Sequence, residues 1–211
     1  MSIKTLAVTF LALGLTQAAP FTQSSVGGPT AIPDNSSVNI DIVVSDTRTI
    51  VGGFSVSLNT FSHTWMGDLN ATITHVDSAT TTFLFNRPGR TTTGFGCSGN
   101  FSGDYSFIDS ATNTLGVSCP GVIPAGSYRA SQDNGATDEE AILIANVFNG
   151  ISAAGTWRLS LQDSAAGDVG TLGSWTLNLE LEDAQNGIPE PATFAVSALG
   201  LIAIAALRRK R

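Results

Sequence analysis

Alternation of apolar and polar residues along the middle of the chain is the feature that most limits its fold. Three stretches show it clearly, at residues 38–42, 54–58 and 69–73. Successive side chains of a β-strand point to opposite faces, so a period of two predicts strands that are buried on one side. Residues 81–85 are apolar enough for another strand, and residues 141–148 for a strand or a short helix. No long amphipathic helix competes, and the pattern predicts an all-β fold.

Two further strands are predicted near the end of this region, at residues 156–161 and 174–181. Each places a tryptophan, Trp157 or Trp175, on the same face as its leucines. We expect both apolar faces to enter one core. The segment between them, residues 163–173, contains three glycines and is too long for a two-residue hairpin turn, so it predicts a shaped loop.

The length of the chain, 211 residues, suits one domain with appendages at both ends. Hydrophobic residues make up 42%, enough for a core, whereas charged residues make up only 13%. Gly, Ser, Thr and Asn are abundant, which favours short strands and turns over long charged helices. We therefore expect a single folded domain at residues 32–183.

The first 19 residues have the pattern of a secretory signal peptide. A basic start at residues 1–4 precedes an apolar run at residues 5–15, and the small residues Ala18 and Ala19 follow. The apolar run would span only about 16 Å as a helix, too short for a membrane anchor. The sequence therefore predicts export, with cleavage by signal peptidase near Ala18 or Ala19 and a linker at residues 20–31.

The end of the chain, residues 184–211, is typical of a stop-transfer segment. Pro189, Glu190 and Pro191 precede sixteen uncharged residues, 192–207. A basic cluster closes the chain, formed by Arg208, Arg209, Lys210 and Arg211. The uncharged run predicts a transmembrane helix of about 24 Å, and the basic cluster should stay in the cytoplasm by the positive-inside preference. An ordinary C-terminal membrane helix is the alternative interpretation.

The charge of the chain between these ends excludes one class of partner. The whole chain has a formal net charge of −7, and removal of both ends leaves five arginines against sixteen acidic residues, a net charge of −11. Phosphate binding needs a basic face, so a nucleic-acid partner is disfavoured. Cations and neutral surfaces suit this composition better.

Two cysteines, Cys97 and Cys119, lie 22 positions apart in a stretch rich in Gly and Ser. An exported chain with one cysteine pair most simply forms one disulfide. The alternatives are weaker, because a structural zinc ion needs four ligands and a catalytic thiol needs a base.

The chain offers few groups for catalysis. Its histidines are His63 and His75, and each is more readily interpreted as a packing and hydrogen-bonding residue than as a general base. It contains no Gly-x-Ser-x-Gly elbow, no His-Glu-x-x-His helix and no phosphate-binding glycine loop. We therefore expect a protein that is not an enzyme.

Four aspartates, Asp68, Asp109, Asp163 and Asp168, are candidate calcium ligands. Calcium takes six to eight oxygens, which carboxylates and loop carbonyls supply. The alternative is that these residues accept hydrogen bonds from nearby backbone amides in turns and caps. No cofactor is required under either interpretation.

Residues 189–211 resemble the PEP-CTERM sorting signal of Gram-negative bacteria in three ordered parts: the Pro-Glu-Pro triplet, the short apolar segment and the basic cluster. The resemblance implies recognition by an exosortase, a membrane transpeptidase. It further implies transient anchoring in the inner membrane, facing the periplasm, before cleavage near the triplet and release to the cell surface or extracellular matrix.

Five separated blocks resemble the P domain (P/Homo B) that follows the catalytic domain of subtilisin-like proprotein convertases. They are residues 63–69 (His-Thr-Trp-Met-Gly-Asp-Leu), 84–89 (Leu-Phe-Asn-Arg-Pro-Gly), 148–150 (Phe-Asn-Gly), 155–157 (Gly-Thr-Trp) and 163–175 (Asp-Ser-Ala-Ala-Gly-Asp-Val-Gly-Thr-Leu-Gly-Ser-Trp). The resemblance implies a jelly-roll-like β-sandwich of about eight strands. Residues 91–124 depart most from the family pattern.

Two functions stay open on this basis. The first is an exported binding or structural module whose partner is a matrix polysaccharide, a surface protein or calcium. The second is an accessory module that acts in trans on a subtilisin-like serine endopeptidase, as the P domain does in cis. Function belongs to a site and not to a fold, so the resemblance alone does not decide between them.

Overall fold

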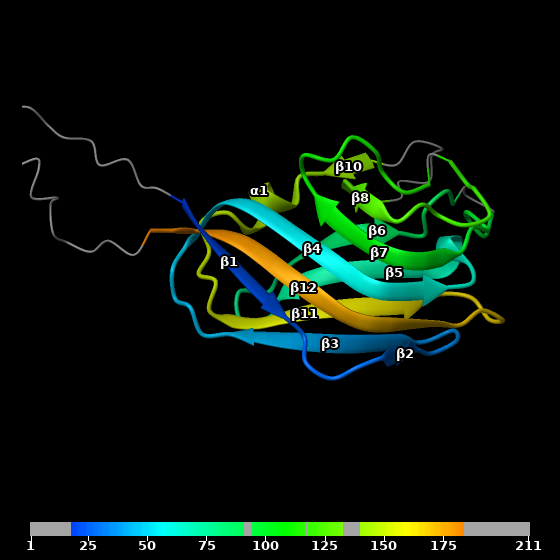
Figure 1. Cartoon of the computed structure of the whole chain (residues 1–211), viewed down its shortest axis with the longest axis horizontal. Helices are drawn as coiled ribbons and strands as arrows, with labels where there is room; N and C mark the ends of the chain where they lie inside the picture. The colour runs from blue at the N-terminus through cyan, green and yellow to red at the C-terminus, as the bar shows by residue number, and fades with distance from the viewer. Residues whose placement is uncertain (1–17, 91–93, 117, 133–139, 184–211) are drawn as a thin grey trace, which may run out of the picture.

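The computed structural model describes residues 18–90, 94–116, 118–132 and 140–183 as a β-sandwich (Figure 1). The strands are β1 (Ala18–Ser24), β2 (Thr30–Ile32), β3 (Ser37–Val44), β4 (Ile50–His63), β5 (Leu69–His75), β6 (Thr80–Asn86), β7 (Phe101–Ile108), β8 (Gly126–Tyr128), β9 (Ala130–Gln132), β10 (Glu140–Ile142), β11 (Gly155–Asp163) and β12 (Gly170–Glu182). The helices are the short 3-10 helix η1 (Met66–Asp68) and α1 (Ile144–Phe148). The prediction of an all-β fold is confirmed.

Two sheets face each other across the core. The larger sheet has the order β1-β12-β4-β7-β8, with β2 also paired to β12, and the smaller has the order β3-β11-β5-β6. Strands β9 and β10 form a separate hairpin-like pair. All pairs within the sheets are antiparallel except β7 with β8.

Eight of the twelve strands have seven or more residues, and these carry the architecture. They are β1, β3, β4, β5, β6, β7, β11 and β12. When only these eight strands are counted, the strand order is β1-β12-β4-β7 in one sheet and β3-β11-β5-β6 in the other. This is the double Greek-key order of a jelly roll, and it agrees with the expected number of about eight principal strands.

The alternation seen in the sequence sets the core. In β5 the apolar side chains of Leu69, Ala71 and Ile73 are buried, while the polar residues between them face outward. Strand β11 buries Trp157 on its inner face, and β12 buries Trp175. Both apolar faces enter the single core, as predicted, although the two strands belong to different sheets. Residues 141–148 contain the end of β10 followed by α1, so both alternatives for this segment occur in part.

The segment expected to be a linker, residues 20–31, differs from that expectation. It contains most of β1 and two residues of β2. Strand β1 pairs along its whole length with β12, and Phe21 packs against the core. Alternation is weak here because β1 is an edge strand, where Pro20 is tolerated since only one side of the strand needs partners.

Both predicted targeting segments lie outside the described residues for most or all of their length. Of the predicted signal peptide, only Ala18 and Ala19 are described, and they begin β1. The predicted transmembrane helix 192–207 and the motif at 189–191 are not described. Among the residues that the structure does describe, no helix has the length and hydrophobicity needed to cross a membrane.

The segment that departs most from the family pattern, residues 91–124, supplies part of the larger sheet. It contains β7, which pairs with β4 and buries Tyr105 and Phe107. Beside it a disulfide joins Cys97 and Cys119, whose Cα atoms are 5.4 Å apart. The predicted cysteine pairing is therefore present.

We expect the disulfide to stabilise the fold by lowering the conformational entropy of the unfolded chain. Closing a loop of this length restricts the unfolded ensemble by about 3 kcal/mol. Replacing both cysteines (Cys97→Ser with Cys119→Ser) should therefore lower the free energy of unfolding by about that amount, measured by urea denaturation. Reduced wild-type protein is the control, since it opens the same loop with both sulfur atoms retained. Equal unfolding midpoints for oxidised and reduced protein would contradict the expectation.

Candidate functional site at the β4, β11 and β12 ends

Polar side chains gather where β4 and β11 end and β12 begins. His63 is the last residue of β4, and Asp163 is the last residue of β11. Gly170 opens β12 and lies opposite His63 in the β4–β12 register. A Cβ atom on Gly170 would collide with the backbone carbonyl oxygen of Ser62 and would lie 2.7 Å from Cδ2 of His63, so glycine is needed at this position. The absence of a side chain at Gly170 thus leaves room for both the β4 backbone and the imidazole.

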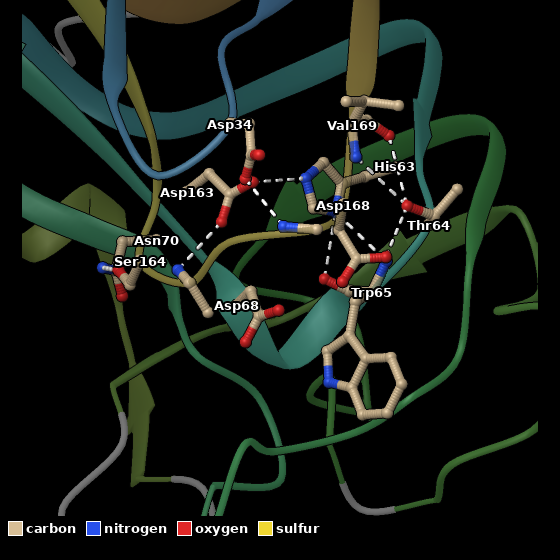
Figure 2. Close-up of polar contacts among 12 residues, drawn as sticks. Asp34, His63, Thr64, Trp65, Asp68, Asn70, Asp163, Ser164, Asp168 and Val169 are labelled. Carbon is tan, nitrogen blue, oxygen red and sulfur yellow. Dashed lines mark hydrogen bonds and ion pairs between the residues drawn. The ribbon is translucent and has the colours of Figure 1, made fainter.

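The central contact of the site is a buried pair between His63 and Asp163. Their side chains point toward each other (Figure 2), with 3.3 Å between His63 Nε2 and Asp163 Oδ2, and both are fully shielded from solvent. The other ring nitrogen, Nδ1, lies 3.0 Å from the carbonyl oxygen and 3.2 Å from the amide nitrogen of Trp65. A neutral ring would donate from Nε2 to the carboxylate and accept from the Trp65 amide. A protonated ring would instead donate from Nδ1 to the Trp65 carbonyl.

Asp163 also fixes the loop that follows it. Its Oδ1 atom accepts a hydrogen bond from the Ala165 amide at 3.1 Å. The amide of Ser164, the residue between Asp163 and Ala165, donates to the backbone carbonyl of Asp68 at 2.9 Å. The start of the loop between β11 and β12 is therefore tied both to the histidine and to η1.

Asp68 forms an ionic contact with Arg87 beside the His63–Asp163 pair. Arg87 Nη2 lies 3.4 Å from Asp68 Oδ1, and Arg87 Nε donates to the carbonyl oxygen of Gly67 at 3.0 Å. Burial raises the pKa of the Asp68 carboxyl, while the Arg87 guanidinium lowers it; the carboxylates of Asp163 and Asp168 add to the rise. The pKa of Asp68 is raised as a result.

The outer rim of the site is held by Asp168. Its Oδ1 atom accepts a hydrogen bond from the Thr64 hydroxyl at 2.7 Å, and that hydroxyl accepts one from the Val169 amide at 3.1 Å. Asp34, from the β2–β3 connection, accepts a bond from the Gly167 amide at 3.0 Å. Three aspartates thus order the β11–β12 loop from three sides, while the ring of Trp65 points away from them (Figure 2).

The structure does not bring the four predicted calcium ligands together. Asp109 lies elsewhere, where its two carboxylate oxygens accept hydrogen bonds from the Ile144 and Ala145 amides at the start of α1. The carboxylates of Asp68, Asp163 and Asp168 already have partners within the chain. Among the described residues, no group of three or more His, Cys, Asp or Glu side chains is arranged to hold a metal ion. Asp109 and Asp163 accept hydrogen bonds from backbone amides, as the turn and capping interpretation expects, whereas Asp68 contacts the Arg87 guanidinium and Asp168 accepts from the Thr64 hydroxyl.

The arrangement lacks the contacts of a nucleophilic site. Both ring nitrogens of His63 face Asp163 or the backbone of Trp65, and no serine hydroxyl in the described residues is within hydrogen-bond distance of them. His75 does contact a serine, with Nδ1 2.8 Å from Ser78 Oγ. The Ser78 hydroxyl donates to Thr80 Oγ1 at 2.9 Å. His75 and Ser78 are three positions apart, at the turn between β5 and β6. The contact therefore closes the β5–β6 turn.

Sequence reasoning found His63, Asp68, Asp163 and Asp168 but missed their partners. Arg87 sits in the 84–89 block, and only the folded chain shows that its side chain reaches η1. Thr64 and Asp34 carried no signal beyond being polar loop residues. The one usable sign was that Arg87 is the only charged residue of the 84–89 block.

Fold and site together define a two-sheet jelly-roll domain whose β4, β11 and β12 ends are joined by a buried histidine–aspartate pair. The proprotein convertase P-domain family model matches residues 124–179, which include β11 and most of β12. The PEP-CTERM protein-sorting motif matches residues 187–210. The stretches that resemble a P domain and a sorting motif thus each match a family model, and both resemblances are confirmed.

Two solved structures that match this chain are of proteins from Aeromonas sobria. One is the serine protease in complex with its chaperone, with a TM-score of 0.46, 19% sequence identity and coverage of 81% of this chain. Another is the serine protease of Aeromonas sobria, with a TM-score of 0.45, 18% identity and coverage of 80%. This chain spans 28% of the length of each of those chains. A search among curated proteins finds no match.

We expect the buried pair to stabilise the fold strongly. Changing His63→Leu leaves the Asp163 carboxylate buried without the ring that faces it, and an unpaired buried charged group costs more than the about 1 to 3 kcal/mol of an unpaired neutral one. His75→Leu is the matched control, because His75 is equally buried but bonds a hydroxyl and a carbonyl, a loss of about 1 to 3 kcal/mol. Urea denaturation gives both values. Equal losses would show that the carboxylate partner adds nothing.

The shifted carboxyls predict opposite effects of pH on stability. The raised folded-state pKa of Asp68 means that its contribution is full below the unfolded value of about 3.9 and is lost as pH rises through the folded value. Hydrogen bonding from Arg158 lowers the pKa of Asp41, so its contribution is present above about 3.9 and is lost as pH falls.

In the wild type, Asp68 should make the free energy of unfolding fall as pH rises toward neutral, and Asp68→Asn should abolish this fall. Asp41 should make it fall as pH becomes acidic, and Asp41→Asn should abolish that fall. Unfolding midpoints in urea, measured from about pH 3 to about pH 7, give the slopes that linkage relates to proton binding. The two variants serve as controls for each other, because each carboxylate faces an arginine. A wild-type slope in Asp68→Asn would contradict the assignment.

Proposed function

We propose that this chain is an exported, non-catalytic P-domain module that an exosortase sorts to the cell surface or extracellular matrix of a Gram-negative bacterium. One observation carries the proposal: the sorting motif at 187–210 begins five residues after the last residue of β12. The folded domain and the processing signal are thus adjacent, and a cut near Pro189 to Pro191 would leave the sandwich whole. Before that cut, residues 192–207 would anchor the module in the inner membrane, facing the periplasm.

The contacts of the candidate site support a role without catalysis. His63 and Asp163 are buried and bonded to each other and to the backbone, as structural residues are. A general base needs a reacting group within hydrogen-bond reach, and the described residues place only a carboxylate and a peptide group beside His63. The P domain as a family accompanies a protease and does not itself carry out proteolysis.

The P-domain match also supports the alternative, an accessory module that acts in trans on a subtilisin-like serine endopeptidase. The two functions differ in a simple measurement. An accessory module would raise the melting temperature of a subtilisin-type protease from the same bacterium when the two are mixed. A module for the surface or matrix would leave that temperature unchanged and remain with the cell-surface fraction.

Sorting is tested in the producing strain with an epitope tag on the C-terminus. Wild-type chain should lose the tag and leave the membrane, whereas in an exosortase-deficient strain it should keep both the tag and its membrane location. Replacing Pro189, Glu190 and Pro191 together by alanine should have the same effect as loss of the exosortase. Gln185→Ala, just before the motif, is the matched control and should be processed normally.

Mass spectrometry of the released protein locates the new C-terminus, which should fall near the Pro-Glu-Pro triplet. Identical mass and location in the wild-type and exosortase-deficient strains would overturn the proposed sorting.

A further inference from the structure

The outer face of the smaller sheet, β3-β11-β5-β6, carries a hollow of about 430 Å³. Hollows that bind ligands have volumes of about 300 to 1,000 Å³. Eight residues line this one, two from each strand of the sheet, and neither His63 nor Asp163 is among them. Asn70 links the hollow to that site, because its side-chain amino group donates to Ser164 Oγ at 2.9 Å. The buried His63 and Asp163 themselves are not part of this surface.

Strand register shows that the lining residues form two complete rows across the sheet. In the first row, Ser160 of β11 lies opposite both Asn39 of β3 and Thr72 of β5, and Thr72 lies opposite Phe83 of β6. Strands lie about 4.8 Å apart, so such a row is about 14 Å long. A surface of this length suits an extended chain better than one small molecule.

The second row repeats the arrangement with amide side chains. Gln162 of β11 lies opposite Ser37 of β3 and Asn70 of β5, and Asn70 lies opposite Asn86 of β6. All of these side chains stand on the face opposite the core, because the residues between them, such as Leu161 and Ala71, are buried.

Phe83 reaches this face because of an irregularity in β6. The register shifts between Ala71, which lies opposite Phe85, and Thr72, which lies opposite Phe83, so that Leu84 is the extra residue of a β-bulge. Leu84 and Phe85 are both buried, and Phe83 is half-buried on the outer side. Without the bulge, Phe83 and Phe85 would share the inner face. Bulges re-aim side chains in this way, often next to binding sites.

The polar groups of the hollow retain unused hydrogen-bonding capacity. The Ser160 hydroxyl donates to Asn39 Oδ1 at 2.6 Å, and Asn70 Nδ2 donates to Gln162 Oε1 at 3.2 Å. These bonds orient the amides but leave the amino groups of Asn39 and Gln162 available. Within the described residues, Asn70 Oδ1 is shielded from solvent and has no donor, and buried acceptors without partners are rare in proteins.

Charge narrows the class of ligand. No charged side chain lines the hollow. In the next row along the sheet, Arg158 and Asp41 neutralise each other through two hydrogen bonds of 2.8 Å. A polyanion or a polycation would find no partner here, and an apolar ligand would leave several amides and hydroxyls unpaired. A neutral polymer rich in hydroxyl groups satisfies the amides and can lay the face of a ring on Phe83.

We propose that the outer face of β3-β11-β5-β6 binds a neutral polysaccharide, with amides and hydroxyls that bond sugar hydroxyls and Phe83 as a stacking platform. The inference rests on the proposed function, since it names the class of partner that an exported matrix module would meet. It is tested independently of sorting, because binding is measured on purified protein.

The experiment uses the full chain, purified in a detergent without a sugar headgroup. The probes are a soluble β-glucan, an α-glucan, a mannan and the neutral fraction of the producing strain's own exopolysaccharide, with oligogalacturonate as the anionic comparison. Isothermal titration calorimetry should show binding to at least one neutral glycan and none to oligogalacturonate. Failure of every neutral glycan to bind, or equal binding of the anionic one, would overturn the proposal.

Variants then assign the binding to this face. Phe83→Leu keeps an apolar side chain but removes the ring face, and Gln162→Ala removes an exposed amide; each should weaken binding about tenfold. Asn178→Ala is the matched control, because Asn178 lies in the larger sheet and bonds Ser55 and Thr22 across strands as the amides of the hollow do. Its affinity should equal that of wild type. Equal affinities for all three variants would overturn the assignment, and circular dichroism checks that each is folded.

Discussion

The packing of β11 and β12 into one core is the interaction on which the rest of the structure depends. Each is an inner strand of its own sheet, since β11 pairs with β3 and β5, and β12 pairs with β1, β2 and β4. Their inward tryptophans and leucines are fully or almost fully buried. Apolar burial of this kind is the main favourable term in folding, and here it joins two sheets through strands that are consecutive in the chain.

The buried polar site follows from that arrangement. The chain must cross from one sheet to the other between β11 and β12, and the crossing leaves backbone amides that no ladder satisfies. Asp163, Asp168 and Asp34 accept hydrogen bonds from amides or from a hydroxyl of this region, and His63 closes it from β4. The histidine and the aspartates of this region thus help to end β4 and β11 and to order the loop between β11 and β12.

Sequence periodicity was sufficient to predict the fold class and most of the core. A strand with one buried face and one solvent-exposed face alternates apolar and polar residues with a period of two. Periodicity failed at β1, where an edge position and Pro20 weaken the pattern, and the strand is visible only through its pairing with β12. It could not place Phe83, since a bulge is a property of two strands together. Of the candidate site, the histidine and three aspartates were found, but Asp109 was grouped with them and caps α1 instead. A list of carboxylates carries no information about which backbone amides will be near them.

Strand β12 also determines how the domain would bear a load. Ala18 and Glu182 lie opposite each other in the β1–β12 register, so the chain enters and leaves the sandwich at one end (Figure 1). Tension applied beyond Glu182 acts along β12, and the hydrogen bonds on both sides of that strand run across the direction of pull. A pull directed along β12 therefore loads these bonds in shear. A module held by its C-terminal end in a flowing or crowded matrix would therefore be attached through a strand that is hydrogen-bonded on both sides.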